Sequence, residues 1–182
     1  MEKQLVKLTW SISLFFVLNS CAFAGSPSVK GLAQNELSQP ETVRQWLQKN
    51  ADKADRKMAE QYFQMGNDYA QKKYWSGAAK AFGESAHAYP APKTLLALTS
   101  AELKMLAEIR ARKKGPNTEE KADLEYAVSM FKAALAADDV LRSLNSNERK
   151  QLEYKIQCVT KYVETGTANP ECSPLKDYGI FD

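Results

Sequence analysis

The chain has 182 residues and a formal net charge of +3, from 25 Lys and Arg against 22 Asp and Glu. So small an excess excludes the strongly basic balance typical of nucleic-acid-binding domains, and we expect no nucleic-acid partner. Only 8 glycines, together with frequent Ala, Leu, Lys, Glu and Gln, favour an all-α protein. The length suffices for one modest domain after an N-terminal segment.

The first 24 residues have the pattern of an export signal. Lys3 and Lys7 form a basic beginning, and residues 8–18 form an apolar run too short to span a bilayer as a helix. Residues 22–24 (Ala-Phe-Ala) form a small-x-small cleavage site. We therefore predict a signal peptide over residues 1–24 and a mature protein in the periplasm of a bacterium.

Lipidation is a second interpretation of the same region. Residues 18–21 (Leu-Asn-Ser-Cys) resemble a bacterial lipobox, although Asn is unusual inside such a box. In that case Cys21 would carry the lipid and become the new N-terminus, and the protein would be a membrane-anchored lipoprotein. Such an anchor is the membrane contact that this second interpretation predicts.

The segment from residue 25 to residue 39 is polar and aperiodic, which predicts a flexible tether. A helical domain over residues 40–166 follows it, because apolar side chains then recur at helical spacing between Pro, Gly and capping signals. The expected helices cover residues 40–50, 52–72, 76–88, 93–113, 119–137 and 145–166.

Residues 167–182 form a C-terminal tail that contains Cys172, and Cys158 lies 14 residues before it. An even pair of cysteines in an oxidising compartment favours a disulfide, and two unrelated buried thiols are the alternative. A bridge that closes a loop of this length stabilises a fold by about 3 kcal/mol on the chain-entropy view. It would fix the tail to the last helix.

The clearest motif lies between residues 62 and 90. Apolar and small residues stand there at characteristic positions: Tyr62, Met65, Gly66, Tyr69, Ala78, Phe82 and Pro90. This spacing resembles the tetratricopeptide repeat (TPR), a helix–turn–helix unit that stacks side by side and typically binds other proteins. In that family the glycine lets the helices approach, the alanine and phenylalanine lie between them, and the proline ends the second helix. The family's tryptophan and leucine are Tyr62 and Met65 here, and Ser85 replaces an alanine.

A second, weaker unit follows the first. The family period of about 34 residues leads from Gly66 to Ser100, but Ala127 and Phe131 match Ala78 and Phe82 only after 49 residues. The second unit therefore resembles a TPR with 15 extra residues, about 104–118, between its helices. The resemblance implies about two helical hairpins, and we expect helices before and after them to act as caps.

The resemblance also implies a binding groove, because the first helix of each TPR pair lines the concave surface. The matching positions are Glu60, Phe63, Asn67, Ala70, Gln71, Thr94, Ala97 and Ala101. Phe63 would be the apolar anchor, with Asn67 and Gln71 as hydrogen-bonding neighbours. Phe63 stands where TPR proteins that capture a terminal carboxylate carry a lysine, which argues against that mode. Packing of Phe63 beneath the N-terminal helix is the alternative.

The residues show no pattern of catalysis. The single histidine, His87, is near a predicted helix end and is interpreted as structural or exposed. There is no Gly-rich phosphate loop and no cluster with metal-ligand spacing, so we expect no cofactor and no metal. The basic run over residues 110–114 fits a solvated helix end, or a contact for an acidic partner or anionic lipid.

These observations predict a non-enzymatic protein–protein interaction module of the bacterial cell envelope. Its short groove would bind a segment of a partner protein, and the module would serve as an accessory or assembly factor. A periplasmic immunity or inhibitor protein that neutralises a toxic or lytic enzyme is the alternative. An enzyme whose site this pattern hides is a third.

Overall fold

The computed structural model describes residues 29–112 and 119–181, and all of their regular elements are helices. The predicted all-α class is confirmed, whereas the signal peptide and Cys21 lie outside the described residues. The helices are α1 Gln34–Leu37, α2 Pro40–Asn50, α3 Arg56–Gln71, α4 Trp75–Ala88, α5 Pro92–Arg112, α6 Glu120–Leu141, α7 Ser146–Thr165 and α8 Ser173–Asp177.

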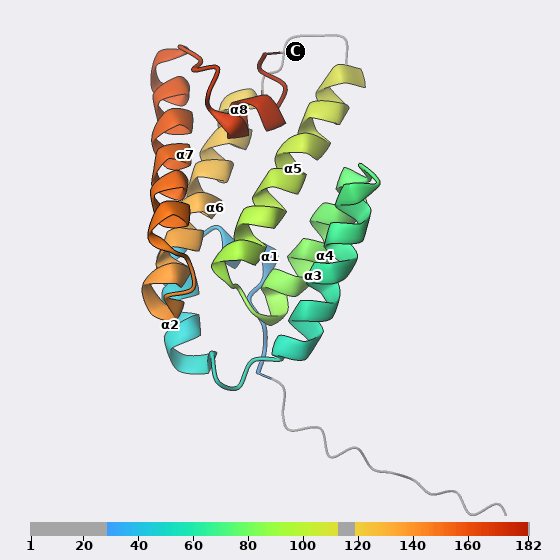
Figure 1. Cartoon of the computed structure of the whole chain (residues 1–182), viewed down its shortest axis with the longest axis vertical. Helices are drawn as coiled ribbons and strands as arrows, with labels where there is room; N and C mark the ends of the chain where they lie inside the picture. The colour runs from blue at the N-terminus through green and yellow to red at the C-terminus, as the bar shows by residue number, and fades with distance from the viewer. Residues whose placement is uncertain (1–28, 113–118, 182) are drawn as a thin grey trace, which may run out of the picture.

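The helices pack mostly in chain order. Helix α3 packs on α4, α4 on α5, and α5 on α6, while α7 and α2 both pack on α6. As a result α3 and α7 lie at opposite edges of the bundle (Figure 1). The helix pairs α3–α4 and α5–α6 cover the residues of the two predicted units, and α5 runs for 21 residues against 16 for α3.

The position of α2 differs from the one expected of a cap on the first hairpin. Arg44 of α2 pairs with Asp139 of α6 at 2.9 Å, and α2 packs on α6 and not closely on α3. Among the described residues, α4 is the one helix that packs closely on α3. The opposite side of α3 therefore stays uncovered by the helices that the structure describes.

The tether prediction does not hold for residues 29–39. Leu32 and Leu37 are buried in the core, and the indole nitrogen of Trp46 donates a hydrogen bond to the carbonyl of Lys30 at 3.1 Å. A Cβ on Gly31 would overlap the carbonyl oxygen of His87, so glycine allows this segment to lie directly on the end of α4. Two leucines without helical periodicity suffice to anchor it, which is why a polar, aperiodic pattern was misleading.

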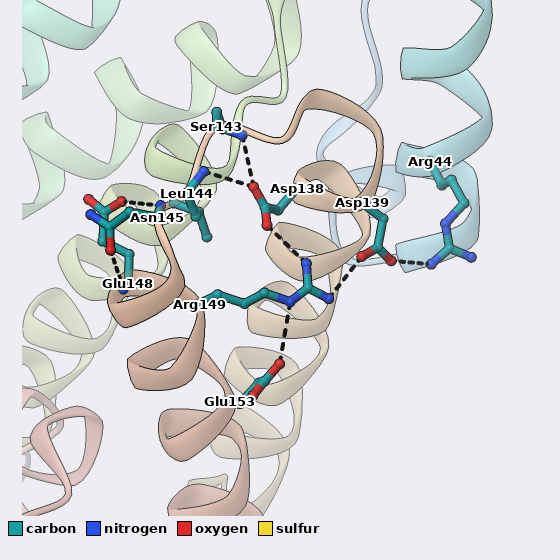
Figure 2. Close-up of polar contacts among 9 residues, drawn as sticks. All are labelled: Arg44, Asp138, Asp139, Ser143, Leu144, Asn145, Glu148, Arg149 and Glu153. Carbon is teal, nitrogen blue, oxygen red and sulfur yellow. Dashed lines mark hydrogen bonds and ion pairs between the residues drawn. The ribbon is translucent and has the colours of Figure 1, made fainter.

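The corner between α6 and α7 is held by the buried carboxylate of Asp138 (Figure 2). Its Oδ1 accepts hydrogen bonds from the backbone N–H groups of Ser143 and Leu144, at 3.0 and 2.8 Å. Its Oδ2 pairs with Arg149 at 2.9 Å. A buried carboxylate with this many partners is compensated, so we assign it a structural role.

Arg149 extends this network toward α2 (Figure 2). It also pairs with Asp139 at 2.9 Å and with Glu153 at 3.4 Å, and Asp139 in turn pairs with Arg44. Although partial burial acts in the opposite direction, hydrogen bonds from Arg149 and Arg44 lower the pKa of Asp139. The network thus joins α2, α6 and α7 by charged hydrogen bonds.

The α3–α4 hairpin is tight where Gly66 meets Phe82. An ideal Cβ on Gly66 would lie 2.5 Å from the Phe82 ring, closer than real Cβ contacts. Ser85, at the position where the family has alanine, is also accounted for, because its hydroxyl donates to the carbonyl of Ala59 at 2.7 Å in the buried interface. A residue that departs from the family pattern therefore adds a hydrogen bond between the two helices.

We expect Gly66→Ala to destabilise the protein, although alanine in a helix is normally favoured over glycine by about 1 kcal/mol. The new methyl group would have to displace the buried Phe82 ring, and overpacking of this kind costs about 1–3 kcal/mol. Gly83→Ala is the matched control, because its Cβ would meet only Gln34, at 3.5 Å. Urea unfolding should show a lower free energy of unfolding for Gly66→Ala and a higher one for Gly83→Ala. Equal stabilisation by both substitutions would contradict the tight contact.

The predicted disulfide between Cys158 and Cys172 is confirmed, with the two Cα atoms 5.9 Å apart. It connects α7 to the segment that leads into α8, which lies between α7 and α5 (Figure 1). Tyr178 is fully buried just after α8. The C-terminal residues are therefore an integral part of the fold.

We expect the mass of the non-reduced protein to rise by about 2 Da on reduction, because each sulfur gains one hydrogen when the bridge opens. Intact mass spectrometry of protein purified without reductant measures this directly. Two thiols that react with an alkylating reagent before reduction would contradict the bridge.

Candidate functional site

One side of α3 carries an exposed stripe of apolar residues. Met58, Met65 and, in the following turn, Tyr74 are exposed, with 38% of Met65 and 56% of Tyr74 accessible to solvent. Tyr62 and Tyr69 are half-buried on the same stripe. Of the three TPR signature residues on this stripe, Met65 is therefore exposed, whereas Tyr62 and Tyr69 are each partly covered.

These side chains line a cleft of about 530 Å³ along the α3–α4 hairpin, which we call the aromatic cleft. It is lined by Tyr62, Met65, Tyr69, Tyr74, Gly77, Lys80, Ala81 and Glu84.

One wall of the aromatic cleft is held in place by its own contacts. The rings of Tyr69 and Tyr74 meet edge to face, with centroids 5.4 Å apart. Gly77 lies directly beneath the Tyr74 ring, where any side chain would overlap it. Lys80 and Glu84 add one charge of each sign on the α4 side. The cleft thus combines aromatic and apolar side chains with two oppositely charged side chains from α4.

The predicted groove positions do not form one continuous surface. Thr94 and Ala101 of α5 are buried, and α3 and α5 are not among the closely packed pairs of the described helices. The ring of Phe63 packs on Phe82 of α4, with centroids 5.4 Å apart, and does not lie beneath an N-terminal helix. Phe63 is therefore part of the hairpin contact.

The remaining groove positions differ in how much they offer to a partner. Glu60 and Gln71 are exposed, and Glu60 accepts a hydrogen bond from Gln64 at 2.6 Å. Asn67, Ala70 and Ala97 are half-buried. The exposed part of the predicted surface is therefore small and polar, in contrast to the aromatic cleft.

A second cleft, of about 480 Å³, contains Glu102, a carboxylic acid whose pKa is strongly raised, and we call it the Glu102 cleft. It is lined by Gln34, Ser76, Ala79, Lys80, Gly83, Glu84, His87, Glu102 and Met105.

The carboxylate of Glu102 is only partly compensated. Its Oε1 accepts a hydrogen bond from Gln34 Nε2 at 3.2 Å, while its buried Oε2 has no hydrogen-bond partner among the described residues. Burial raises the pKa of Glu102 to about 7. Burial, and next the charge of Glu102, raise the pKa of the neighbouring Tyr126 to about 12.

Sequence reasoning missed Glu102 because an acidic residue on a long helix is normally solvated, and the pattern of α5 does not show that Gln34 of α1 reaches its carboxylate. His87, the single histidine, is exposed and lines this cleft. Within residues 29–112 and 119–181, no group of three His, Cys, Asp or Glu side chains is placed to hold a metal ion. In the same ranges, none of the helices has the length and apolar character that a membrane span requires.

The basic run has a structural use at Arg110. Its guanidinium donates to the carbonyl of Tyr178 at 2.7 Å, pairs with Glu120 at 3.3 Å and lies 4.2 Å from the Tyr178 ring centroid. Tyr162 shares this partner, because its hydrogen bonding to Glu120, followed by burial, raises the pKa of Tyr162 to about 12. Arg110 therefore stabilises the C-terminal segment, whereas residues 113 and 114 lie outside the described residues.

Comparison with known proteins identifies no relative, because no family model, curated protein or solved structure matches the chain. The TPR resemblance therefore stays a prediction that depends on the residues of the α3–α4 hairpin.

Proposed function

We propose that this protein is a non-enzymatic protein–protein interaction module of the bacterial cell envelope, and that it binds a segment of its partner in the aromatic cleft. In this role it acts as an accessory or assembly factor, built from TPR-like hairpins. The observation that carries the proposal is the exposed tyrosine and methionine surface along the α3–α4 hairpin.

Tyrosine and methionine are enriched in protein interfaces, and tyrosine supplies a large contact area at small entropic cost. In the aromatic cleft they are adjacent, and Tyr69 and Tyr74 hold each other in place before any partner binds. Preorganised contacts of this kind increase affinity, because less conformational freedom is lost on binding. A cleft of about 530 Å³ suits a short helix or a few extended residues.

Export is part of the proposal. The Cys158–Cys172 bridge is compatible with an oxidising compartment, where such bonds persist. The partner is therefore expected among proteins of the periplasm or of the membranes that border it.

The proposal is tested by affinity capture from envelope extracts of the source cell, quantified by mass spectrometry. We expect Met65→Ser combined with Tyr74→Ser to reduce capture of a specific partner by about tenfold or more, because an aromatic residue at a binding hot spot contributes about 2 kcal/mol or more. Tyr154→Ser is the matched control, since Tyr154 is 39% exposed on α7, at the opposite edge of the bundle. Equal loss of partner capture by the cleft variant and the control, or no loss by either, would contradict the proposal.

A further variant separates the aromatic cleft from the groove predicted by the family resemblance. Asn67→Ala combined with Gln71→Ala changes the polar part of that groove and leaves the Phe63–Phe82 contact in place. We expect this variant to capture the partner normally. If this variant alone lost the partner, the binding surface would instead be assigned to the predicted groove on the other side of α3.

A further inference from the structure

The two clefts are neighbours. Lys80 and Glu84 of α4 line both of them, so the aromatic cleft lies on one side of this pair and the Glu102 cleft on the other. A segment that occupies the aromatic cleft can therefore reach the Glu102 cleft by crossing a single helix. The side chains that line the Glu102 cleft therefore indicate which residues such a segment carries.

Among the described residues, the carboxylate of Glu102 has fewer hydrogen-bond donors than it can accept. Its buried Oε2 has no hydrogen-bond partner, and the one bond to Oε1 comes from a neutral amide, that of Gln34. An ionised carboxylate in this environment is costly unless a cation accompanies it. The contrast with Asp138 is informative, because that carboxylate is buried with two N–H donors and Arg149 around it.

The remaining lining fits the stem of a long cationic side chain. Ala79, Gly83 and Met105 supply small and apolar surface, along which the methylene groups of Lys or Arg pack readily. Glu84 adds a second carboxylate on the α4 side. The cleft therefore combines an apolar wall with an acidic group that lacks a counter-charge.

We propose that the Glu102 cleft binds the cationic end of a lysine or arginine side chain that the partner protein supplies, with the Glu102 carboxylate as its counter-charge. This inference rests on the proposed function, and it adds that the partner segment is both apolar and basic. The charged and titratable groups around the site are Lys80, Glu84 and His87 from α4, Tyr126 from α6 and Glu102 itself, with the amide of Gln34 from α1. Lys80 is exposed, and its flexible stem lets its ammonium group remain in solvent when a second cation enters.

The test uses small probes that carry the proposed group. N-acetyl-arginine methylamide and N-acetyl-lysine methylamide are titrated into the folded protein at pH 8, and the backbone amides of Gln34, Gly83 and Glu102 are followed by two-dimensional NMR. We expect saturable shifts at these amides in the millimolar range. N-acetyl-citrulline methylamide has nearly the shape of the arginine probe without its charge, and it should produce no saturable shift.

Glu102→Gln should weaken binding of both cationic probes by about tenfold or more, since a hydrogen bond to a charged group typically contributes enough for such a change. Glu84→Gln, at the α4 side of the cleft, should change affinity by about twofold at most, as expected for an exposed charge. Equal binding of arginine and citrulline probes, unchanged binding to Glu102→Gln, or no binding of either cationic probe would overturn the inference.

A second measurement separates this inference from the proposed function. Partner capture is compared for Glu102→Gln and for the Met65→Ser, Tyr74→Ser protein. If both lose the partner, and Glu102→Gln remains folded by circular dichroism, the inference and the function are both supported. If Glu102→Gln captures the partner normally while the cleft variant does not, the function stands and the inference fails.

Discussion

Tyr178→Ala should lower the free energy of unfolding by about 3–5 kcal/mol, the range for removal of a large buried aromatic side chain. The Tyr178 ring is fully buried, its hydroxyl donates to Asp123 at 2.6 Å, and Arg110 lies over its face at 4.2 Å. The substitution would leave a cavity between α8 and the ends of α5 and α6. It would also leave Asp123 without the hydroxyl group that donates to it. Urea unfolding followed by far-ultraviolet circular dichroism measures the loss.

Two companion variants make this result specific. Tyr178→Phe keeps the ring and removes only the hydroxyl, so we expect a loss of about 1 kcal/mol. Phe181→Ala changes an aromatic residue in the same tail that is 41% exposed, and it should cost less than about 1 kcal/mol. A loss below about 1 kcal/mol for Tyr178→Ala would show that the C-terminal segment is not packed as described.

Glu102→Gln should stabilise the protein at pH 8 by about 3 kcal/mol more than it does at pH 4, because it removes a carboxylate whose ionisation opposes folding. The pKa of Glu102 is raised from 4.5 to about 7 by burial, so the folded state holds its proton more tightly than the unfolded state does. The contribution of Glu102 to stability is then fully present below pH 4.5 and is lost as the pH rises through about 7.

The measurement is the free energy of unfolding of both proteins between pH 4 and pH 8.5. Glu164→Gln, on the exposed surface of α7, provides the matched control and should follow the wild-type curve. The difference between wild type and Glu102→Gln should grow between pH 4.5 and about 7 and then level off. A constant difference across this range would show that Glu102 is solvated or paired in the folded protein.

The helices themselves were largely predictable, because local signals determine where they end. Pro90 and Pro92 separate α4 from α5, and Asn145 caps α7 through hydrogen bonds to its side chain, as the capping-box pattern indicates. The start of α3 shows the limit of such reasoning. The expected beginning was residue 52, but the side chain of Asp55 accepts from Met58 N–H and the helix begins at Arg56.

Tertiary placement was less accessible, because it depends on contacts between distant segments. The apolar pattern of α2 predicts a helix with one buried face but does not say that α6 is the helix it meets. The exposure of Met65 follows directly from that placement, since α2 does not cover α3. Glu102 is a similar case, because its one hydrogen-bond donor among the described residues is Gln34 of α1, a segment whose sequence predicts a tether.

The most direct test of partner binding through the aromatic cleft is position-specific photo-cross-linking in living cells. A photoreactive phenylalanine analogue is placed at Met65 in the cleft or at Tyr154 on α7 as the control. We predict that irradiation joins the protein to one specific envelope protein from position 65 and not from position 154. Absence of a cross-link from position 65, or the same product from both positions, would contradict binding through the aromatic cleft.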